Sequence, residues 1–437
     1  DDIKALTDSA TLELLRRVWK HGAPPAPDLG AITTRSVPAL RAYLEGELAF
    51  IQSRYDVAVA AFERSFAADS TFSLAYWRSL YPRIYEGSRP DPAIVASIVA
   101  HRHRLPNAEA MMVDASAAAT LSEKLDILRN VTTRHPDYWP GWYAYADRLV
   151  HDGPYLGSTY GDARAALERV VELNPDFASG WVHLHWITSL QRDTVGVNRT
   201  VANLDRLAIA SGWVNPGNMT LAYAFQEMLR SDGELSDELA GELDRAALRA
   251  TAASNRAVLL FVYGFPRGQL RQIDAVLRTD PPRDVAVAQW RGRAYTWAGR
   301  GAWDSAFVAM EQWVRLSNEP RSALRAYGLA VLGVITGAVD AAAARRWRPG
   351  SHPPEADGAD WLAERSWLDG VLAHAAADTG GIRQALRELS ARGAQHADLL
   401  VPSLRALMAD AAGRRTDAAR ALLALELTAA ERGHTRS

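Results

Sequence analysis

The chain has 437 residues, of which 48% are hydrophobic and 23% are charged, and its formal net charge at pH 7 is −2. This near-neutral balance gives no support to a nucleic-acid groove, which needs an excess of positive charge to neutralise phosphates. The chain has no cysteine, so disulfides and thiolate metal sites are excluded. No apolar run reaches the roughly 18 residues that a membrane-spanning helix requires, so no membrane span is expected.

Residues 1–37 are predicted to form an N-terminal helix followed by a proline-rich connector. Ala5–Lys20 has the apolar spacing of an amphipathic helix, and residues 21–28 contain three prolines that prevent its continuation. Ser36 stands two residues before Pro38, which suits an N-cap followed by a proline in the first helical turn. A new helix is therefore expected to begin near residue 37.

Residues 38–71 form a unit of 34 residues whose pattern indicates two helices joined by a turn. Gly46 and Ala58 are small enough to let two antiparallel helices approach closely, and Phe62 can fill the seam beside them. In this spacing the unit resembles a tetratricopeptide repeat. The resemblance implies an all-α, right-handed superhelical solenoid of antiparallel helix hairpins, in which each hairpin buries its apolar face against the next.

Further units of the same kind follow along the chain. We expect an N-terminal array of repeats over residues 38–191 and degenerate helical repeats over 192–282, where the period loosens. The pattern returns over 283–346, where Ala294 and Ala306 repeat the spacing of the two small residues in the first unit.

The C-terminal part of the chain is predicted to hold a loop and two closing hairpins. Residues 347–360 are rich in proline and glycine, which favours a long loop. Residues 361–437 are expected to form helical hairpins that end in a solvent-facing cap.

A narrower resemblance covers residues 1–112. Leu14–Trp19, Ala31–Ala39 and Ala39–Glu47 resemble the segments that begin the C-terminal tetratricopeptide region of bacterial receptor-like serine/threonine kinases and related multidomain transcriptional activators. The resemblance implies a sensor or docking module, with any catalytic or DNA-binding domain outside these residues. The kinase motifs themselves are absent, as are phosphate-binding and dinucleotide-binding glycine patterns.

The leading functional hypothesis is a non-enzymatic module that binds a protein or peptide, with a small ligand as a possible alternative, and without catalytic residues, cofactor or metal. The resemblance places the first helix of each unit on the concave face, and exposed aromatic side chains there would be rigid binding anchors. Packing against the next hairpin could still account for half of these aromatic residues. The candidate binding residues are Tyr43, Glu47, Trp77, Tyr81, Tyr85, Tyr143, Asp147, Trp186, Arg291 and Tyr295.

Two other functions stay open. A helical-repeat hydrolase would need two carboxylates about 5 to 10 Å apart in the concave face, and Glu47 with Asp147 is the pair that comes nearest. The repeat arm of a transcriptional activator would need an adjoining DNA-binding domain.

His183 and His185 are two residues apart on a predicted helix, so they point in different directions and cannot share a metal ion. The absence of cysteine and of an initiator methionine favours a bacterial extracytoplasmic compartment, with the cytoplasm as the alternative.

Overall fold

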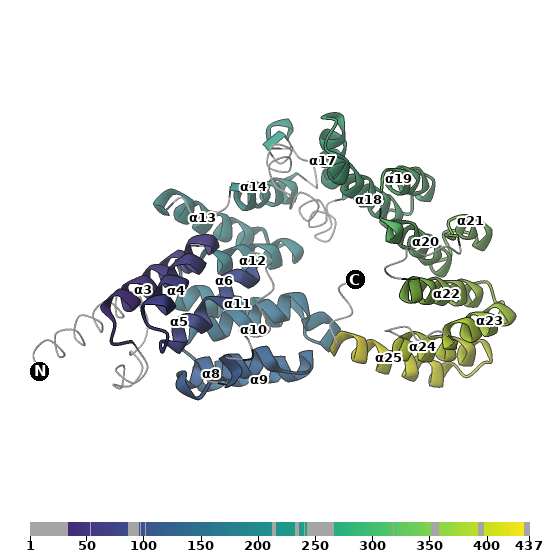
Figure 1. Ribbon diagram of the computed structural model, residues 1–437. Coiled ribbons are helices and arrows are strands. Elements are labelled where there is room, and N and C mark those ends of the chain that lie inside the picture. The colour runs from purple at the N-terminus through teal and green to yellow at the C-terminus, as the bar shows by residue number, and fades with distance from the viewer. Residues whose placement is uncertain are drawn as a thin grey trace, which may run out of the picture. The chain divides into compact units, whose positions relative to one another are not determined.

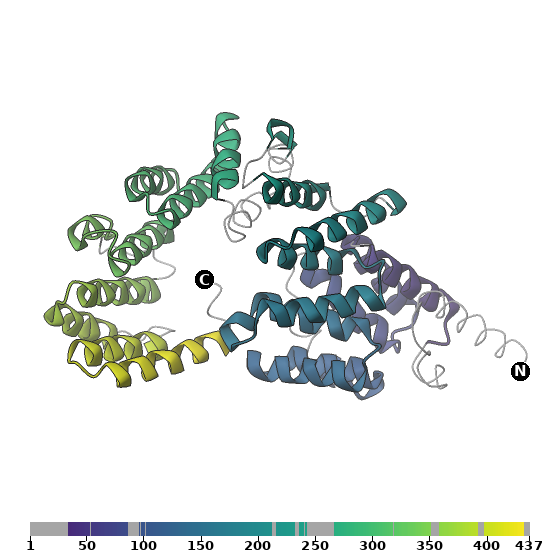
Figure 2. The same ribbon diagram turned by 180° about the vertical axis from the view of Figure 1, so that it is seen from behind.

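The fold is all-helical, which confirms the predicted class. Within the part of the chain that the computed structural model describes there is no strand, and consecutive helices pack as antiparallel hairpins (Figures 1 and 2). No helix among these residues is long and apolar enough to span a membrane. The residues described are 34–52, 54–85, 96, 98–100, 102–211, 216–231, 236–239, 241–242, 266–317, 319–350, 358–391 and 397–431.

The N-terminal helix expected at Ala5–Lys20 and its connector lie outside the described residues, as do residues 351–357 of the loop expected at 347–360 and much of the segment 232–265. The chain divides into two compact units. Unit 1 runs to Ala222, and unit 2 runs from Tyr223 to Ala429.

Unit 1 is built mainly from consecutive helix hairpins, each formed by a first and a second helix that contact one another. Two short 3₁₀ turns, η1 (Arg102–Arg104) and η2 (Gly153–Leu156), lie between α-helices. The α-helices are α3 (Val37–Ile51), α4 (Tyr55–Ala68), α5 (Ser73–Arg78), α6 (Leu80–Tyr85), α8 (Asn107–Ala117), α9 (Leu121–Arg134), α10 (Trp139–His151), α11 (Tyr160–Leu173), α12 (Ala178–Leu190) and α13 (Thr194–Ser211).

The first hairpin, α3 with α4, forms as its sequence predicts. Ser36 caps α3 by accepting a hydrogen bond from the backbone N–H of Ala39. A Cβ atom added at Gly46 would lie 2.7 Å from the ring of Phe62, so only glycine allows the two helices to approach this closely. Ala58 is fully buried and Phe62 is 1% exposed. The small and aromatic positions therefore set the packing of the hairpin.

A break at Ser79 divides the first helix of the second hairpin into α5 and α6. Pro82 lies in α6, four residues after Arg78, and has no N–H to donate to the Arg78 carbonyl. Its ring also crowds that carbonyl, which accounts for the interruption immediately after Arg78.

Unit 1 also folds back on itself. The ring of Phe50 on α3 lies 6.4 Å from that of Trp139 on α10 and 5.8 Å from that of Phe177, which precedes α12. The side-chain oxygens of Tyr55 and Ser179, on α4 and α12, are 2.6 Å apart. In a regular solenoid each repeat contacts only its neighbours. Here the first hairpin reaches helices that come much later in the chain, and the space between them is filled by rings.

Unit 2 contains a second series of hairpins, and helix α14 (Pro216–Arg230) contains the boundary between the units. Ala294 and Ala306 are fully buried, which confirms the predicted small positions, and Trp313 and Tyr327 fill the core beside them. The remaining helices are α17 (Pro266–Arg278), α18 (Arg283–Gly299), α19 (Trp303–Leu316), α20 (Pro320–Ile335), α21 (Ala341–Arg345), α22 (Gly358–Ala375), α23 (Thr379–Ser390), α24 (Ala397–Ala411) and α25 (Arg415–Glu431).

Candidate functional site

The predicted binding residues of unit 1 lie mostly inside it rather than on an open face. Trp77 is 4% exposed, Tyr143 3%, Glu47 9% and Asp147 8%. The reason is the closure described above, because the ring of Phe50 and its neighbours occupy the space that an open solenoid would leave to a ligand. A protein or peptide cannot reach these four side chains unless unit 1 opens.

Glu47 and Arg78 form a buried ion pair between the first helices of neighbouring hairpins. Nε and Nη2 of Arg78 donate to the two carboxylate oxygens of Glu47 at 2.5 and 2.6 Å. The same guanidinium lies over the rings of Phe50 and Tyr81, at 5.5 and 5.2 Å from their centroids. Such cation–π contacts help to compensate a charge that is removed from water.

Glu109 on α8 is the second buried carboxylate of this region. It accepts a hydrogen bond of 2.6 Å from Nε1 of Trp77. Burial raises the pKa of Glu109, and the charge of Arg78 together with the hydrogen bond from Trp77 opposes that rise. One arginine therefore faces two buried carboxylates, and the second carboxylate is the less well compensated.

The other aromatic candidates of unit 1 also make packing contacts. The ring of Tyr43 lies 5.7 Å from that of Phe62 and 5.1 Å from that of Phe72, and burial raises the pKa of its hydroxyl. Tyr81 is half-buried with its ring 5.2 Å from that of Trp77. Tyr85 ends α6, and its side chain lies outside the described part of the chain.

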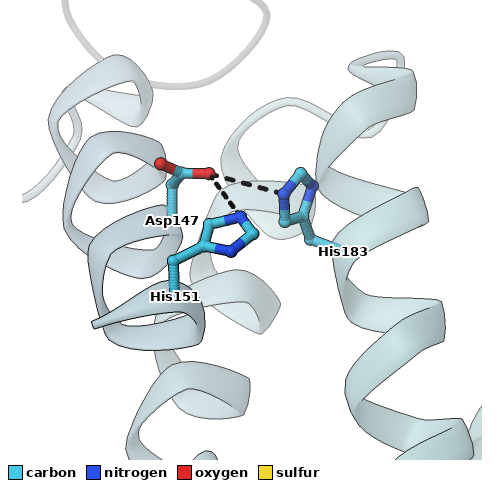
Figure 3. A group of neighbouring side chains, drawn as sticks. All are labelled: Asp147, His151 and His183. Atoms are coloured by element: carbon cyan, nitrogen blue, oxygen red, sulfur yellow. Dashed lines mark ion pairs between the residues drawn. The ribbon is translucent and has the colours of Figure 1, made fainter. Parts of the chain in front are cut away.

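The structure brings Asp147 together with two histidines, as Figure 3 shows. Oδ1 of Asp147 lies 3.4 Å from Nε2 of His151, one turn later on α10, and 3.4 Å from Nε2 of His183 on α12. The ring of Trp186 lies 4.6 Å from that of His183. Sequence reasoning singled out Asp147 and Trp186 but missed His151, although its spacing of four residues from Asp147 on one helix was a usable signal.

His183 and His185 have different surroundings, as their spacing predicts. Nδ1 of His185 lies 2.8 Å from the hydroxyl of Thr200, away from Asp147. Burial lowers the pKa of His185 to about 3, so this ring is neutral. His183 alone joins the group in Figure 3.

Neither carboxylate of the hypothetical hydrolase pair is free for acid–base chemistry. Glu47 is bound through both oxygens by Arg78, and Nη2 of Arg148 lies 2.5 Å from Oδ2 of Asp147. Burial raises the pKa of Asp147, but the contacts with His151 and His183 and the charge of Arg148 hold it well below its usual range. A carboxylate kept ionised in this way is a poor general acid.

Unit 2 keeps its two predicted binding residues at the surface. Tyr295 on α18 is 40% exposed, and one side of its ring lies 6.1 Å from that of the buried Trp313. Arg291 precedes it by one turn on the same helix. Burial raises the pKa of Tyr295, and the positive charges of Arg291 and of Arg325 on α20 oppose that rise.

A cavity of about 260 Å³ also lies in unit 2, beside α20, α22 and α23. Two of its charged lining groups, Arg348 and Asp369, are paired with each other. Arg348 donates to both oxygens of Asp369 at 2.7 and 2.6 Å, and the hydroxyl of Tyr327 donates to the same carboxylate at 2.8 Å.

Comparison with known proteins yields only a distant likeness. No family model and no curated protein matches the chain. The crystal structure of the P58(IPK) TPR domain is similar over 85% of this chain and 98% of its own, at 11% sequence identity and a TM-score of 0.18. So low a score supports no argument, and the helical hairpins themselves identify the fold.

Proposed function

We propose that the chain is a non-enzymatic helical-repeat module that binds a protein or peptide, and that the partner docks on unit 2. The surface in question, called the α18–α20 face, is formed by exposed and half-buried residues of two first helices. Its members are Arg291 and Tyr295 of α18 and Arg321, Arg325 and Leu332 of α20.

The observation that carries this proposal is an aromatic ring left exposed beside two guanidinium groups. Tyr295 is fixed on one side by Trp313, so binding would cost it little conformational freedom. Helices α18 and α20 contact each other. On α20, Leu332 follows Arg325 by seven residues and so lies on the same side, and it is 50% exposed. The face therefore combines apolar anchors with positive charge.

The charges on this face indicate the chemistry of the partner. Arg321 is paired with Glu364 at 3.0 Å, whereas Arg325 makes only a 3.8 Å contact with Glu319. Arg291 has no ion-pair partner among the residues that the structure describes. Arginine binds carboxylates through two parallel hydrogen bonds. The occupant that fits is an extended peptide with acidic side chains next to an apolar one.

The test uses random peptides displayed on phage and selected on the whole chain. We expect the selected peptides to contain Asp or Glu beside an apolar residue. Fluorescence polarisation with one such peptide should show that Tyr295→Ala and Arg291→Glu each weaken binding by about 1 kcal/mol or more. Tyr160→Ala and Arg420→Glu alter an exposed tyrosine and arginine elsewhere and should leave affinity unchanged. Peptides that bind all four variants equally would refute this docking face.

A narrower proposal is that this module is the sensor or scaffold part of a larger bacterial signalling protein. Its support is the resemblance of residues 1–112 to repeat regions of receptor-like kinases. The sequence of the complete gene tests it. A kinase domain in the same reading frame would support a sensor, a DNA-binding domain would favour the repeat arm of a transcriptional activator, and the absence of both would refute both assignments.

A further inference from the structure

We propose that Asp147, His151 and His183 bind a divalent transition-metal ion, with zinc the best match to these ligands. The three residues are called the Asp-His-His cluster. Their ligand atoms, one carboxylate oxygen and two imidazole nitrogens, all lie within 4.8 Å of one another (Figure 3). Three protein ligands that include two histidines are typical of zinc sites with an open fourth position.

The distances within the Asp-His-His cluster suit tetrahedral coordination. With ligand bonds of about 2.0 to 2.1 Å, neighbouring ligand atoms around a tetrahedral zinc ion lie about 3.3 Å apart. Oδ1 of Asp147 is 3.4 Å from the Nε2 atoms of both His151 and His183. Two of the three ligand separations are thus already in place. The side chain of His151 is 40% exposed, so its ring can move to shorten the third.

The tautomer of His183 is fixed by its backbone contact. Nδ1 of His183 lies 2.9 Å from the carbonyl oxygen of Ser179, which can only accept, so Nδ1 carries the proton. In the neutral ring the lone pair is then on Nε2, which faces Oδ1 of Asp147. Two acceptors that face each other at 3.4 Å repel unless a cation, either a proton on Nε2 or a metal ion, lies between them. A metal ion meets this requirement, and hydrogen bonding of this kind is what orients histidine ligands in metal sites.

The orientation of Asp147 is fixed in a similar way. Arg148 donates to Oδ2 at 2.5 Å, which leaves Oδ1 directed at the histidines. Arg148 is held in turn by Asp152 at 2.9 Å. Two carboxylates and one guanidinium give this group a net negative charge, so it attracts a cation despite the arginine.

The surroundings of the Asp-His-His cluster provide a wall and an entrance. The ring of Tyr143 lies 5.6 Å from that of His183 on one side, and the ring of Trp186 lies 4.6 Å away. The side chain of His151 is 40% exposed, so water reaches the cluster at this residue. A metal ion could therefore enter without any rearrangement of the helices and keep a water molecule as its fourth ligand.

The test is metal binding by the whole chain after dialysis against EDTA. Isothermal titration with Zn²⁺ should show one site per chain, and Co²⁺ should give the visible absorption of a tetrahedral complex. His151→Ala, which alters an exposed residue and should fold, is expected to weaken zinc binding at least about tenfold. Asp147→Asn should do the same, with circular dichroism confirming its fold.

The matched control is His374→Ala. His374 forms a similar pair with Asp410 at 2.8 Å but belongs to no group of three ligands among the described residues. The His374→Ala variant should bind zinc like the wild type. Zinc should raise the melting temperatures of the wild type and of His374→Ala, but not that of His151→Ala. Failure of the wild type to bind zinc, or equal binding by His151→Ala, would overturn the proposal.

Discussion

The side-chain oxygens of Tyr55 and Ser179 lie 2.6 Å apart, although 124 residues separate them in the chain. This contact joins helix α4 to helix α12, and the ring of Phe50 reinforces it by packing on Trp139 and Phe177. Unit 1 is therefore a closed body whose first and last hairpins share a core. The closure decides which side chains a partner can reach, because the inner face of the unit is filled by its own aromatic rings.

Phe50 is expected to be one of the most important side chains for the stability of unit 1. It is 2% exposed, so Phe50→Ala should lower the free energy of unfolding by about 3 to 5 kcal/mol. Urea denaturation followed by circular dichroism measures the change. Leu48→Ala, two residues away and 53% exposed, is the control and should change stability by about 0.5 kcal/mol or less. Equal effects of the two substitutions would show that the first hairpin does not pack on later ones.

Trp77 and Tyr295 were equivalent candidates in the sequence, and they should behave differently when truncated. Trp77→Ala removes a ring that is 4% exposed and leaves Glu109 without its donor, so it should cost about 3 to 5 kcal/mol. Tyr295→Ala should cost about 1 kcal/mol or less, because its ring is 40% exposed. Thermal unfolding of both variants provides the comparison. A folded and fully stable Trp77→Ala variant would contradict the burial of this ring.

The difference between these two residues marks the limit of what the sequence predicts. The hairpins follow from local rules, since Gly46, Ala58 and Ala294 are needed wherever two helices approach closely. Whether an aromatic residue on a first helix faces water depends on how far the unit curves. Curvature is the sum of small rotations between hairpins, and no single position in the sequence encodes it.

The Asp-His-His cluster illustrates the same limit. Asp147 and His151 share one helix, and their spacing of four residues is visible in the sequence. His183 joins them only because α10 and α12 pack side by side as the first helices of consecutive hairpins. The spacing of His183 and His185 correctly predicts that these two residues face different surroundings. It carries no information about partners of His183 on other helices.

The buried pair of Glu47 and Arg78 should be strongly coupled. Arg78→Met leaves the Glu47 carboxylate buried without its counter-ion, which should cost about 3 to 5 kcal/mol. The double variant Glu47→Leu with Arg78→Met should cost less than the sum of the two single changes. The exposed pair of Glu45 and Arg64 is the control, and Arg64→Met should cost about 1 kcal/mol or less. Additive effects in a double-mutant cycle at Glu47 and Arg78 would disprove the coupling.

Glu109 should make the stability of unit 1 depend on pH. Burial raises its pKa from the ordinary 4.5, so the folded chain keeps a proton that the unfolded chain has already lost. Stability should then fall as the pH rises from about 4.5 through the raised pKa, by at most about 1.4 kcal/mol per pH unit. Glu109→Gln cannot ionise and still accepts from Trp77, so its stability relative to the wild type should increase over that range.

Urea denaturation of the wild type and Glu109→Gln at pH 4.5 and at pH 7 tests this pH dependence. Glu311→Gln, at an exposed position, controls for the loss of one carboxylate and should follow the wild type at both pH values. A constant difference between Glu109→Gln and the wild type would show that Glu109 titrates alike in the folded and unfolded chains.

The contacts of Phe50 also determine how unit 1 comes apart. An array whose repeats touch only their neighbours can fray from its ends, and its terminal repeats open more easily than its centre. In unit 1 the first hairpin supplies a ring to the core between α10 and α12, so it cannot detach without exposing Trp139 and Phe177 to water. The backbone amides of α3 should therefore exchange with solvent as slowly as those of α12, as parts of one cooperative unit.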